Sequence, residues 1–193
     1  MYRGKTGRNY LDLDNRNFCR TFNIIKNRLF METFEIGRKG ELGVIEILES
    51  KGCVIIDDYT ETADYDIKAL YRGKERTFEV KTQPNAFRVY EAFTIEIGDS
   101  SPTYYDASIN NIKQDINTNK RYYPTGLSVS NSDYYVFTDT QHYIFVPTKK
   151  LKTLVRRIYK NEPKRFKFNP NTISSYGVAI RIEELNEICI FCK

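Results

Sequence analysis

The chain has 193 residues, of which 28% are charged, and its formal net charge at pH 7 is +5. This length and composition predict a single globular domain over residues 1–193. No segment approaches the roughly 20 apolar residues that a membrane-spanning helix needs, and residues 1–18 lack the apolar core of a secretory signal. We therefore expect a cytoplasmic protein with no membrane partner.

Residue types that are scarce in this chain argue against several kinds of chemistry. His142 is the only histidine, so Ser-His-Asp catalysis and metal sites with two histidine ligands have little support. The cysteines form one CxxC pair and no second pair, which favours reduced thiols over a zinc site; they are Cys19, Cys53, Cys189 and Cys192. The sequence also lacks a GxxxxGK[ST] loop, so nucleotide-driven chemistry is not expected.

The N-terminal part of the chain predicts two helices and a strand. Residues 18–34 carry apolar side chains at helical spacing. A second helix is predicted over residues 39–51, after a break at Gly37 and before Gly52 as its C-terminal glycine. A short buried strand is predicted over residues 53–58.

Strands dominate the remainder. Alternating apolar and polar residues predict a strand pair over residues 62–83 with a turn at Gly73, a strand over residues 92–98 and a second hairpin over residues 133–148. A basic helix over residues 148–159 and two closing strands follow. The expected fold is α/β, with a central mixed sheet flanked by helices.

Residues 99–125 show no clear periodicity and are rich in tyrosine and asparagine. They predict a long loop with one short helix. Their tyrosines either stack on unpaired bases or pack the loop against the core; they include Tyr104, Tyr105, Tyr122 and Tyr123.

Polar side chains gather on one face of the strand that ends the first pair. Successive side chains of a strand point to opposite faces, so Glu79, Lys81 and Gln83 share a face opposite to their apolar neighbours. Asp66 stands at the start of the preceding strand, and pairing of the two strands brings its carboxylate toward Glu79. This set is either a solvated sheet surface or a functional site.

A glutamate of the second predicted helix lies on its apolar stripe. Val44 and Leu48 follow Glu41 by three and seven residues, so all three side chains face the core, whereas Glu46 and Glu49 face solvent. An unpaired buried carboxylate is costly. A cation beside the strands would be a suitable partner for Glu41.

The carboxylates suggest which cation this is. Mg²⁺ and Mn²⁺ prefer carboxylate, carbonyl and water oxygens. Lys81 would stand beside a metal-bound water, so the set suits phosphodiester hydrolysis, in which a metal and a lysine stabilise the charged transition state.

The basic residues are concentrated in residues 148–168, whereas the acidic residues gather between Glu41 and Asp99. This segment predicts either a surface for a polyanion such as nucleic acid or a solvated helix face. The residues expected to contact nucleic acid are Lys149, Lys150, Lys152, Arg156 and Arg157.

Asp66, together with the "EVK" of residues 79–81, resembles the PD-(D/E)XK motif of the restriction-endonuclease-like nuclease superfamily. Residues 37–52, "GRKGELGVIEILESKG", are similar to the N-terminal helix of archaeal-type Holliday junction resolvases. "GLSVSNSDYYVF" and the later "YIFVPTKKLKTLV" look like uncharacterised phage members. The resemblance spans residues 38–155 and implies a restriction-endonuclease-like core.

This resemblance also implies roles for single residues. Asp66 and Glu79 bind the metal, Glu41 completes the site, and Lys81 is the catalytic lysine. Gln83 matches a polar residue that some members place after the lysine.

The chain departs from the family pattern in one place and offers alternatives in two others. Tyr65 stands where the motif has proline. Asp64 lies two residues before Asp66, so either could be the first metal ligand; we prefer Asp66 because a strand continues directly after it. Glu96 is a further carboxylate that could approach the site.

The sequence therefore predicts a nuclease that hydrolyses DNA with Mg²⁺ or Mn²⁺. Residues 1–36 would be an N-terminal extension, 38–155 the nuclease core, and 148–193 the basic helix with the closing strands. Likeness to resolvases implies branched DNA and a homodimer, because symmetric incision needs two sites; single-stranded DNA is another expected substrate. The composition suits an AT-rich genome such as a viral one.

Three alternatives remain open at this stage. The first is a nucleic-acid-binding module on the same fold that does not cleave. The second is a nuclease that acts on RNA. The third is a structural protein in which the ExK spacing is accidental.

Overall fold

The structure is a computed structural model that describes residues 14–58, 65–100, 113–115, 117–169 and 174–193. The chain divides into two compact units, Met1–Ile36 and Gly37–Lys193. Helix α1 (Asp14–Ser50) contributes to both, and the described strands all belong to the second. No described helix is both long and apolar enough to cross a membrane.

Helix α1 corrects the prediction of two helices over residues 18–34 and 39–51, because it continues through Gly37. A glycine inside a helix costs about 1 kcal/mol relative to alanine, which is too little to end the helix on its own. The predicted C-terminal glycine is confirmed, since Gly52 has a φ of +80°. Its N–H donates to the Glu49 carbonyl at 2.8 Å, which satisfies part of the last turn.

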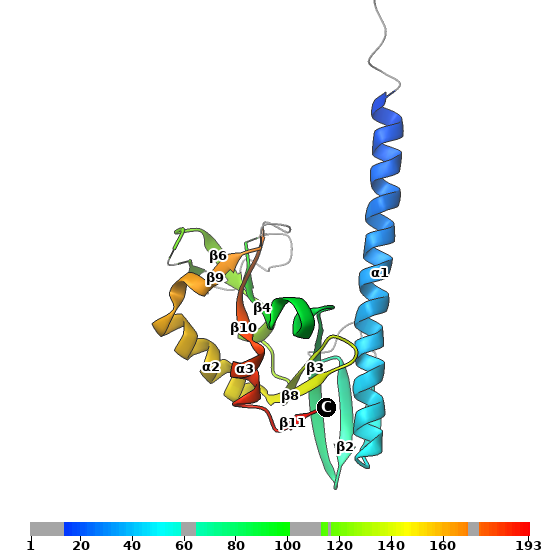
Figure 1. Ribbon diagram of the computed structural model, residues 1–193, viewed down its shortest axis with the longest axis vertical. Helices are drawn as coiled ribbons and strands as arrows, with labels where there is room; N and C mark the ends of the chain where they lie inside the picture. Colours follow the sequence, from blue (N-terminus) through cyan, green and yellow to red (C-terminus); the bar gives the residue numbers. More distant parts are fainter. Residues whose placement is uncertain (1–13, 59–64, 101–112, 116, 170–173) are drawn as a thin grey trace, which may run out of the picture. The chain divides into compact units, whose positions relative to one another are not determined.

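The first sheet contains, in spatial order, β1 (Val54–Asp57), β2 (Ile67–Tyr71), β3 (Lys74–Thr82), β7 (Tyr134–Thr138), β8 (Tyr143–Pro147) and β11 (Phe191–Cys192) (Figure 1). β3 and β7 pair in parallel, and the other described neighbours are antiparallel. Both predicted hairpins are confirmed. The first turns at Arg72 and Gly73, whose positive φ angles are typical of a two-residue hairpin loop.

The prediction of a buried strand over residues 53–58 is wrong in its burial. β1 lies at the edge of the sheet, where Val54 and Ile56 are 62% and 48% exposed. A short apolar run does not reveal how many neighbours a strand will have, because that depends on where the sheet places it.

The second sheet contains, in spatial order, β5 (Lys113–Gln114), β6 (Arg121–Pro124), β4 (Ala92–Asp99), β10 (Ser175–Arg181) and β9 (Phe166–Phe168). Strand β4 confirms the strand predicted over residues 92–98. In contrast, the described part of residues 99–125 contains the β5–β6 pair and no helix.

A buried carboxylate explains why the described end of this segment forms a strand pair; residues 101–112 and 116, on which the rest of the loop prediction falls, lie outside the described residues. Asp115 accepts the Thr118 N–H at 3.0 Å and the Tyr176 hydroxyl at 2.7 Å, which holds the turn between β5 and β6. Such a turn leaves no hydrophobic periodicity in the sequence. Tyr122 is buried with its ring 4.4 Å from that of Tyr176, so this tyrosine packs the core; Tyr104 and Tyr105 lie outside the described residues.

The predicted basic helix is confirmed as α2 (Thr148–Asn161). Shorter helical elements join the strands: η1 (Ala86–Tyr90), η3 (Gly126–Ser128), η4 (Pro163–Arg165) and α3 (Ile182–Asn186). In the view of Figure 1, α2 and α3 lie among the later elements of the second unit, near β8, β9 and β10.

Two hydrophobic cores cover the opposite faces of the first sheet. On one face, Val44, Ile47 and Leu48 of α1 pack among side chains of β2, β3, β7 and β8. On the other face, Tyr135 and Phe137 of β7 pack with α2 and the second sheet. The fold is therefore α/β with a mixed sheet flanked by helices, as the sequence predicts.

The contact between α1 and β8 depends on Gly43. A Cβ at this position would overlap the ring and hydroxyl of Tyr143, which is buried and donates to the Thr140 carbonyl at 3.2 Å. We expect Gly43→Ala to destabilise the protein by about 1–3 kcal/mol, measured by urea denaturation. Gly37→Ala is the control, because its Cβ would meet no atom; equal effects of the two substitutions would contradict the prediction.

Candidate active site

Strand alternation places Glu79 and Lys81 on one face of β3. Their partners on the parallel strand β7 are Tyr135 and Phe137, so they share the face of the core that contains α2 and the second sheet. The side chains of Glu79 and Lys81 are 17% and 35% exposed, and Nζ of Lys81 lies 2.6 Å from Oε1 of Glu79. This partial burial distinguishes the pair from a fully solvated sheet surface.

Asp66 is held against the same strand by two contacts. Its backbone N–H donates to the Phe78 carbonyl at 2.9 Å. Its carboxylate Oδ2 accepts the backbone N–H of Val80 at 2.6 Å. Because Val80 separates Glu79 from Lys81, this second bond fixes the Asp66 carboxylate beside both polar side chains.

The environment of Asp66 opposes its ionisation. Burial and, to a smaller extent, the neighbouring Glu79 together raise the pKa of Asp66 to about 6, although the Val80 N–H and Lys81 act in the opposite direction. Glu41 adds a smaller rise. Two carboxylates close enough to repel one another are an arrangement that a cation would stabilise.

The environment of Lys81 favours its charged form. Burial by itself lowers the pKa of Lys81, but the attraction of Glu79 and Asp66 outweighs this and leaves that pKa above its ordinary value. Lys81 is therefore an ammonium group at neutral pH. It can donate hydrogen bonds to an anionic ligand but does not serve as a base.

Glu41 lies on the core-facing side of α1, but it has a partner that sequence reasoning missed. Its carboxylate accepts a hydrogen bond from Arg38 at 3.0 Å, and Arg38 also pairs with the Asp58 carboxylate at 2.8 Å. The only sequence signal was the helical spacing of three residues between Arg38 and Glu41. Among the described side chains, no three of the Asp, Glu, His and Cys type are grouped closely enough to form a metal-ligand set.

The remaining carboxylate and amide candidates have structural partners. The Gln83 amide donates to the Thr94 carbonyl at 2.7 Å and accepts the Thr94 N–H at 2.9 Å, which joins the end of β3 to β4. Glu96 accepts the hydroxyls of Thr125 and Ser175, each at 2.7 Å. Asp64 lies outside the described residues.

Tyr135 is a residue near the site that sequence reasoning did not single out. It is fully buried, and burial raises its pKa to about 12. The hydroxyl of Ser130 is close enough to lower that pKa slightly, but no described group forms a hydrogen bond of ordinary geometry with the Tyr135 hydroxyl. Tyr135, the partner of Glu79 in the register of β3 and β7, thus has a protonated hydroxyl without a hydrogen bond of ordinary geometry among the described residues.

The cations predicted to contact nucleic acid divide between two sides of α2. Lys152 and Arg156 line a pocket together with Lys113 of β5. A second pocket, on the other side of the helix, is lined by Lys149, Lys150 and Arg157. Arg157 pairs with Glu187 at 3.6 Å, and both side chains are more than half exposed.

The thiols and the histidine lie away from the polar face of β3. Cys53, Cys189 and Cys192 are free thiols, and the Cys19 side chain is outside the described residues. His142 is exposed and lies against a carboxylate of its own turn at 3.2 Å.

Comparisons with protein-family models, with curated proteins and with solved structures found no match for this chain. The residues of the site and the resemblance of the "EVK" motif are therefore the basis on which a function can be assigned.

Proposed function

We propose that this protein is a divalent-metal-dependent nuclease with a restriction-endonuclease-like core, and that it hydrolyses phosphodiester bonds in DNA. The observation that carries the proposal is the grouping of Asp66, Glu79 and Lys81 on neighbouring strands. Their spacing matches the PD-(D/E)XK motif, and their contacts bring two carboxylates and one ammonium group together.

The donor set fits Mg²⁺ or Mn²⁺. Asp66 uses one carboxylate oxygen for the Val80 N–H, and Glu79 uses one for Lys81. No described residue hydrogen-bonds to Oδ1 of Asp66 or to Oε2 of Glu79. Both free oxygens are hard donors of the kind these cations prefer, and a cation would offset the repulsion that raises the pKa of Asp66.

A bound divalent ion would lower the pKa of a water and neutralise charge on the phosphate. The side chains of this site have complementary roles. Lys81 is an ammonium group fixed by Glu79, so it can donate to a phosphate oxygen and orient the attacking water. Asp66 and Glu79 would hold the cation, and the Val80 N–H keeps the Asp66 carboxylate in place.

The cations of α2 support an anionic, extended substrate. Lys149, Lys150 and Arg156 are exposed on this helix, and phosphate contacts by such residues supply most non-specific affinity for nucleic acid. Branched DNA, which the likeness to resolvases implies, belongs to the same proposal, as does a homodimer that would cut both strands.

A second candidate function is a nucleic-acid-binding module that does not cleave. The contact that favours it is the ion pair of Glu41 with Arg38, because a glutamate held by an arginine is less available to a metal. The site then offers two carboxylates rather than the three that the resemblance implies.

Incubation of the protein with supercoiled, linear, single-stranded and four-way-junction DNA, and with RNA of matched sequence, tests the proposal. We expect cleavage of at least one DNA in Mg²⁺ or Mn²⁺ and none in EDTA, and the preferred DNA would identify the kind of nuclease. Cleavage of RNA but of none of the DNA substrates would show that the substrate is RNA. Binding without cleavage of any of these nucleic acids would instead favour the non-cleaving module.

A further inference from the structure

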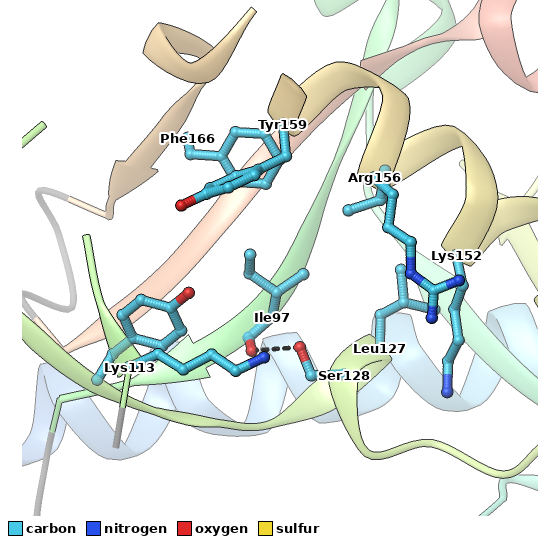
Figure 2. A pocket seen from close by; sticks show the side chains of 10 residues that line it. Ile97, Lys113, Leu127, Ser128, Lys152, Arg156, Tyr159 and Phe166 are labelled. Carbon is cyan, nitrogen blue, oxygen red and sulfur yellow. Dashed lines mark hydrogen bonds between the residues drawn. The ribbon is translucent and has the colours of Figure 1, made fainter. Parts of the chain in front are cut away.

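A pocket between α2 and the second sheet combines cations with aromatic rings. Its volume is about 330 Å³, which lies at the lower end of the range of small-molecule sites. Figure 2 shows Lys113 on one side, Lys152 and Arg156 together on another, and Tyr159 beside Phe166. We call it the Arg156 pocket; its lining residues are Ile97, Lys113, Tyr122, Leu127, Ser128, Lys152, Val155, Arg156, Tyr159 and Phe166.

Among the described residues, no acidic side chain compensates the charge of the Arg156 pocket. Three cations and no carboxylate line it, and no ion pair of Lys113, Lys152 or Arg156 occurs among the described residues. Lys152 donates to the Ser130 carbonyl at 2.8 Å, and burial together with the neighbouring Arg156 lowers its pKa. An anion in the pocket would relieve this repulsion and would receive charge-assisted hydrogen bonds.

The aromatic part of the pocket is held by packing. The Tyr159 and Phe166 rings meet edge to face with centroids 5.1 Å apart. Phe166 is buried, whereas Tyr159 is 38% exposed, so Tyr159 keeps ring surface available for a ligand. A planar apolar group beside a phosphate would meet both features of this pocket.

The pocket on the other side of α2 lacks these features. It is lined by Lys149, Lys150 and Arg157 together with three other residues, none of them aromatic. One of its three cations already has a carboxylate partner, because Arg157 pairs with Glu187. The difference between the two sides of one helix argues against a uniformly solvated basic surface.

We propose that the Arg156 pocket binds one nucleotide of single-stranded DNA, with the phosphate against Arg156 and Lys152, the base against Tyr159, and Lys113 facing the nucleotide from the other side of the pocket. This inference rests on the proposed nuclease function and adds to it a preference for unpaired strands. Bases in a duplex are stacked on their neighbours and are not free to contact a tyrosine, whereas unpaired bases stack on aromatic side chains.

The test is fluorescence anisotropy of a labelled oligothymidylate in EDTA, with Arg156→Ala and Arg157→Ala as a matched pair. Both substitutions remove one exposed arginine from α2, so a diffuse electrostatic effect would be the same for both. We expect Arg156→Ala to weaken binding about tenfold, as loss of a hydrogen-bonded charge does. Although the sequence predicts a nucleic-acid contact for Arg157 as well, this residue lies outside the Arg156 pocket and already pairs with Glu187, so Arg157→Ala should weaken binding by less than about threefold.

The base contact has its own readout. Tyr159→Leu should weaken binding of the oligothymidylate at least about fivefold, whereas Tyr159→Phe keeps the ring and should bind like the wild type. Replacement of the bases by abasic residues should remove the difference between Tyr159→Leu and wild type. Circular dichroism of each variant would verify that it is folded under the assay conditions.

The inference would be overturned if the oligothymidylate did not bind, or if Arg156→Ala and Arg157→Ala lost equal affinity. It would also be overturned if duplex DNA bound as tightly as the oligothymidylate and lost as much affinity in the variants. Tighter binding of thymidine monophosphate than of the strand would also overturn it, in favour of a free nucleotide. Binding is measured in EDTA and therefore does not depend on cleavage. If the pocket binds the oligothymidylate as expected but the protein cleaves no DNA in Mg²⁺ or Mn²⁺, only the proposed nuclease function is refuted. Metal-dependent cleavage with equal losses for the two arginines would refute only the pocket.

Discussion

Replacement of Lys81 by alanine is expected to reduce metal-dependent DNA cleavage by at least about a hundredfold. Lys81 is the only cation in direct contact with the Glu79 carboxylate among the described residues, and Glu79 and Asp66 keep its pKa above the ordinary value. Its ammonium group therefore stays charged throughout the neutral range. In the proposed mechanism, loss of this charge would remove a donor to the developing negative charge on the phosphate.

Lys74→Ala is the matched control for this experiment. Lys74 begins the same strand, β3, and is exposed, so its removal changes the net charge equally without reaching the site. Initial rates on the preferred DNA in Mg²⁺ would be compared at equal fractions of folded protein, verified by thermal melting. Wild-type cleavage by Lys81→Ala, or equal losses in the two variants, would show that Lys81 is not a catalytic residue.

Replacement of Asp66 by asparagine is expected to stabilise the protein above pH 6 and to abolish binding of a cation at the proposed metal site. The pKa of Asp66 in the folded protein is about 6, against an ordinary value of 3.8. Ionisation of Asp66 is therefore less favourable in the folded state than in the unfolded chain. A shift of about two pKa units corresponds to about 3 kcal/mol, and it destabilises the folded wild type.

The pH range of this effect follows from the two pKa values. Below pH 3.8 the carboxyl is protonated in both states and there is no penalty. The penalty grows as pH rises toward 6 and is complete above that value. Asparagine cannot ionise and its carbonyl can still accept the Val80 N–H, so Asp66→Asn should exceed wild type in unfolding free energy by up to about 3 kcal/mol above pH 6.

Urea denaturation in EDTA at several pH values would measure this difference. Glu49→Gln removes an exposed carboxylate of α1 and is the control. Addition of Mg²⁺ should stabilise the wild type by mass action and leave the stability of Asp66→Asn unchanged. The difference in unfolding free energy between the two proteins should therefore decrease. A gap that does not depend on pH would contradict the assigned environment of Asp66, and no response of the wild type to Mg²⁺ would count against the metal site.

Some contacts of the candidate site could be predicted from a local sequence pattern, and others could not. The period of two in "TFEVKTQ" was sufficient to predict that Glu79 and Lys81 share a face, because a strand imposes that alternation wherever it lies. The position of Asp66 beside them required only that two successive strands pair across a short turn. The hydrogen bonds of Gln83 were not predictable in this way, because its partner Thr94 belongs to a strand of the other sheet.

The sequence by itself determined the elements with a clear period or a defined end: the two hairpins, α2, β4 and the Gly52 end of α1. Tertiary structure alone decided that Asp58 would pair with the arginine that holds Glu41, that β1 would be an exposed edge, and that Lys113 would join Lys152 and Arg156 in one pocket. The physical reason is the range of the interactions. Periodicity and turn chemistry act over a few neighbouring residues, whereas the Arg38–Asp58 ion pair and the Arg156 pocket form between segments that are distant in the sequence.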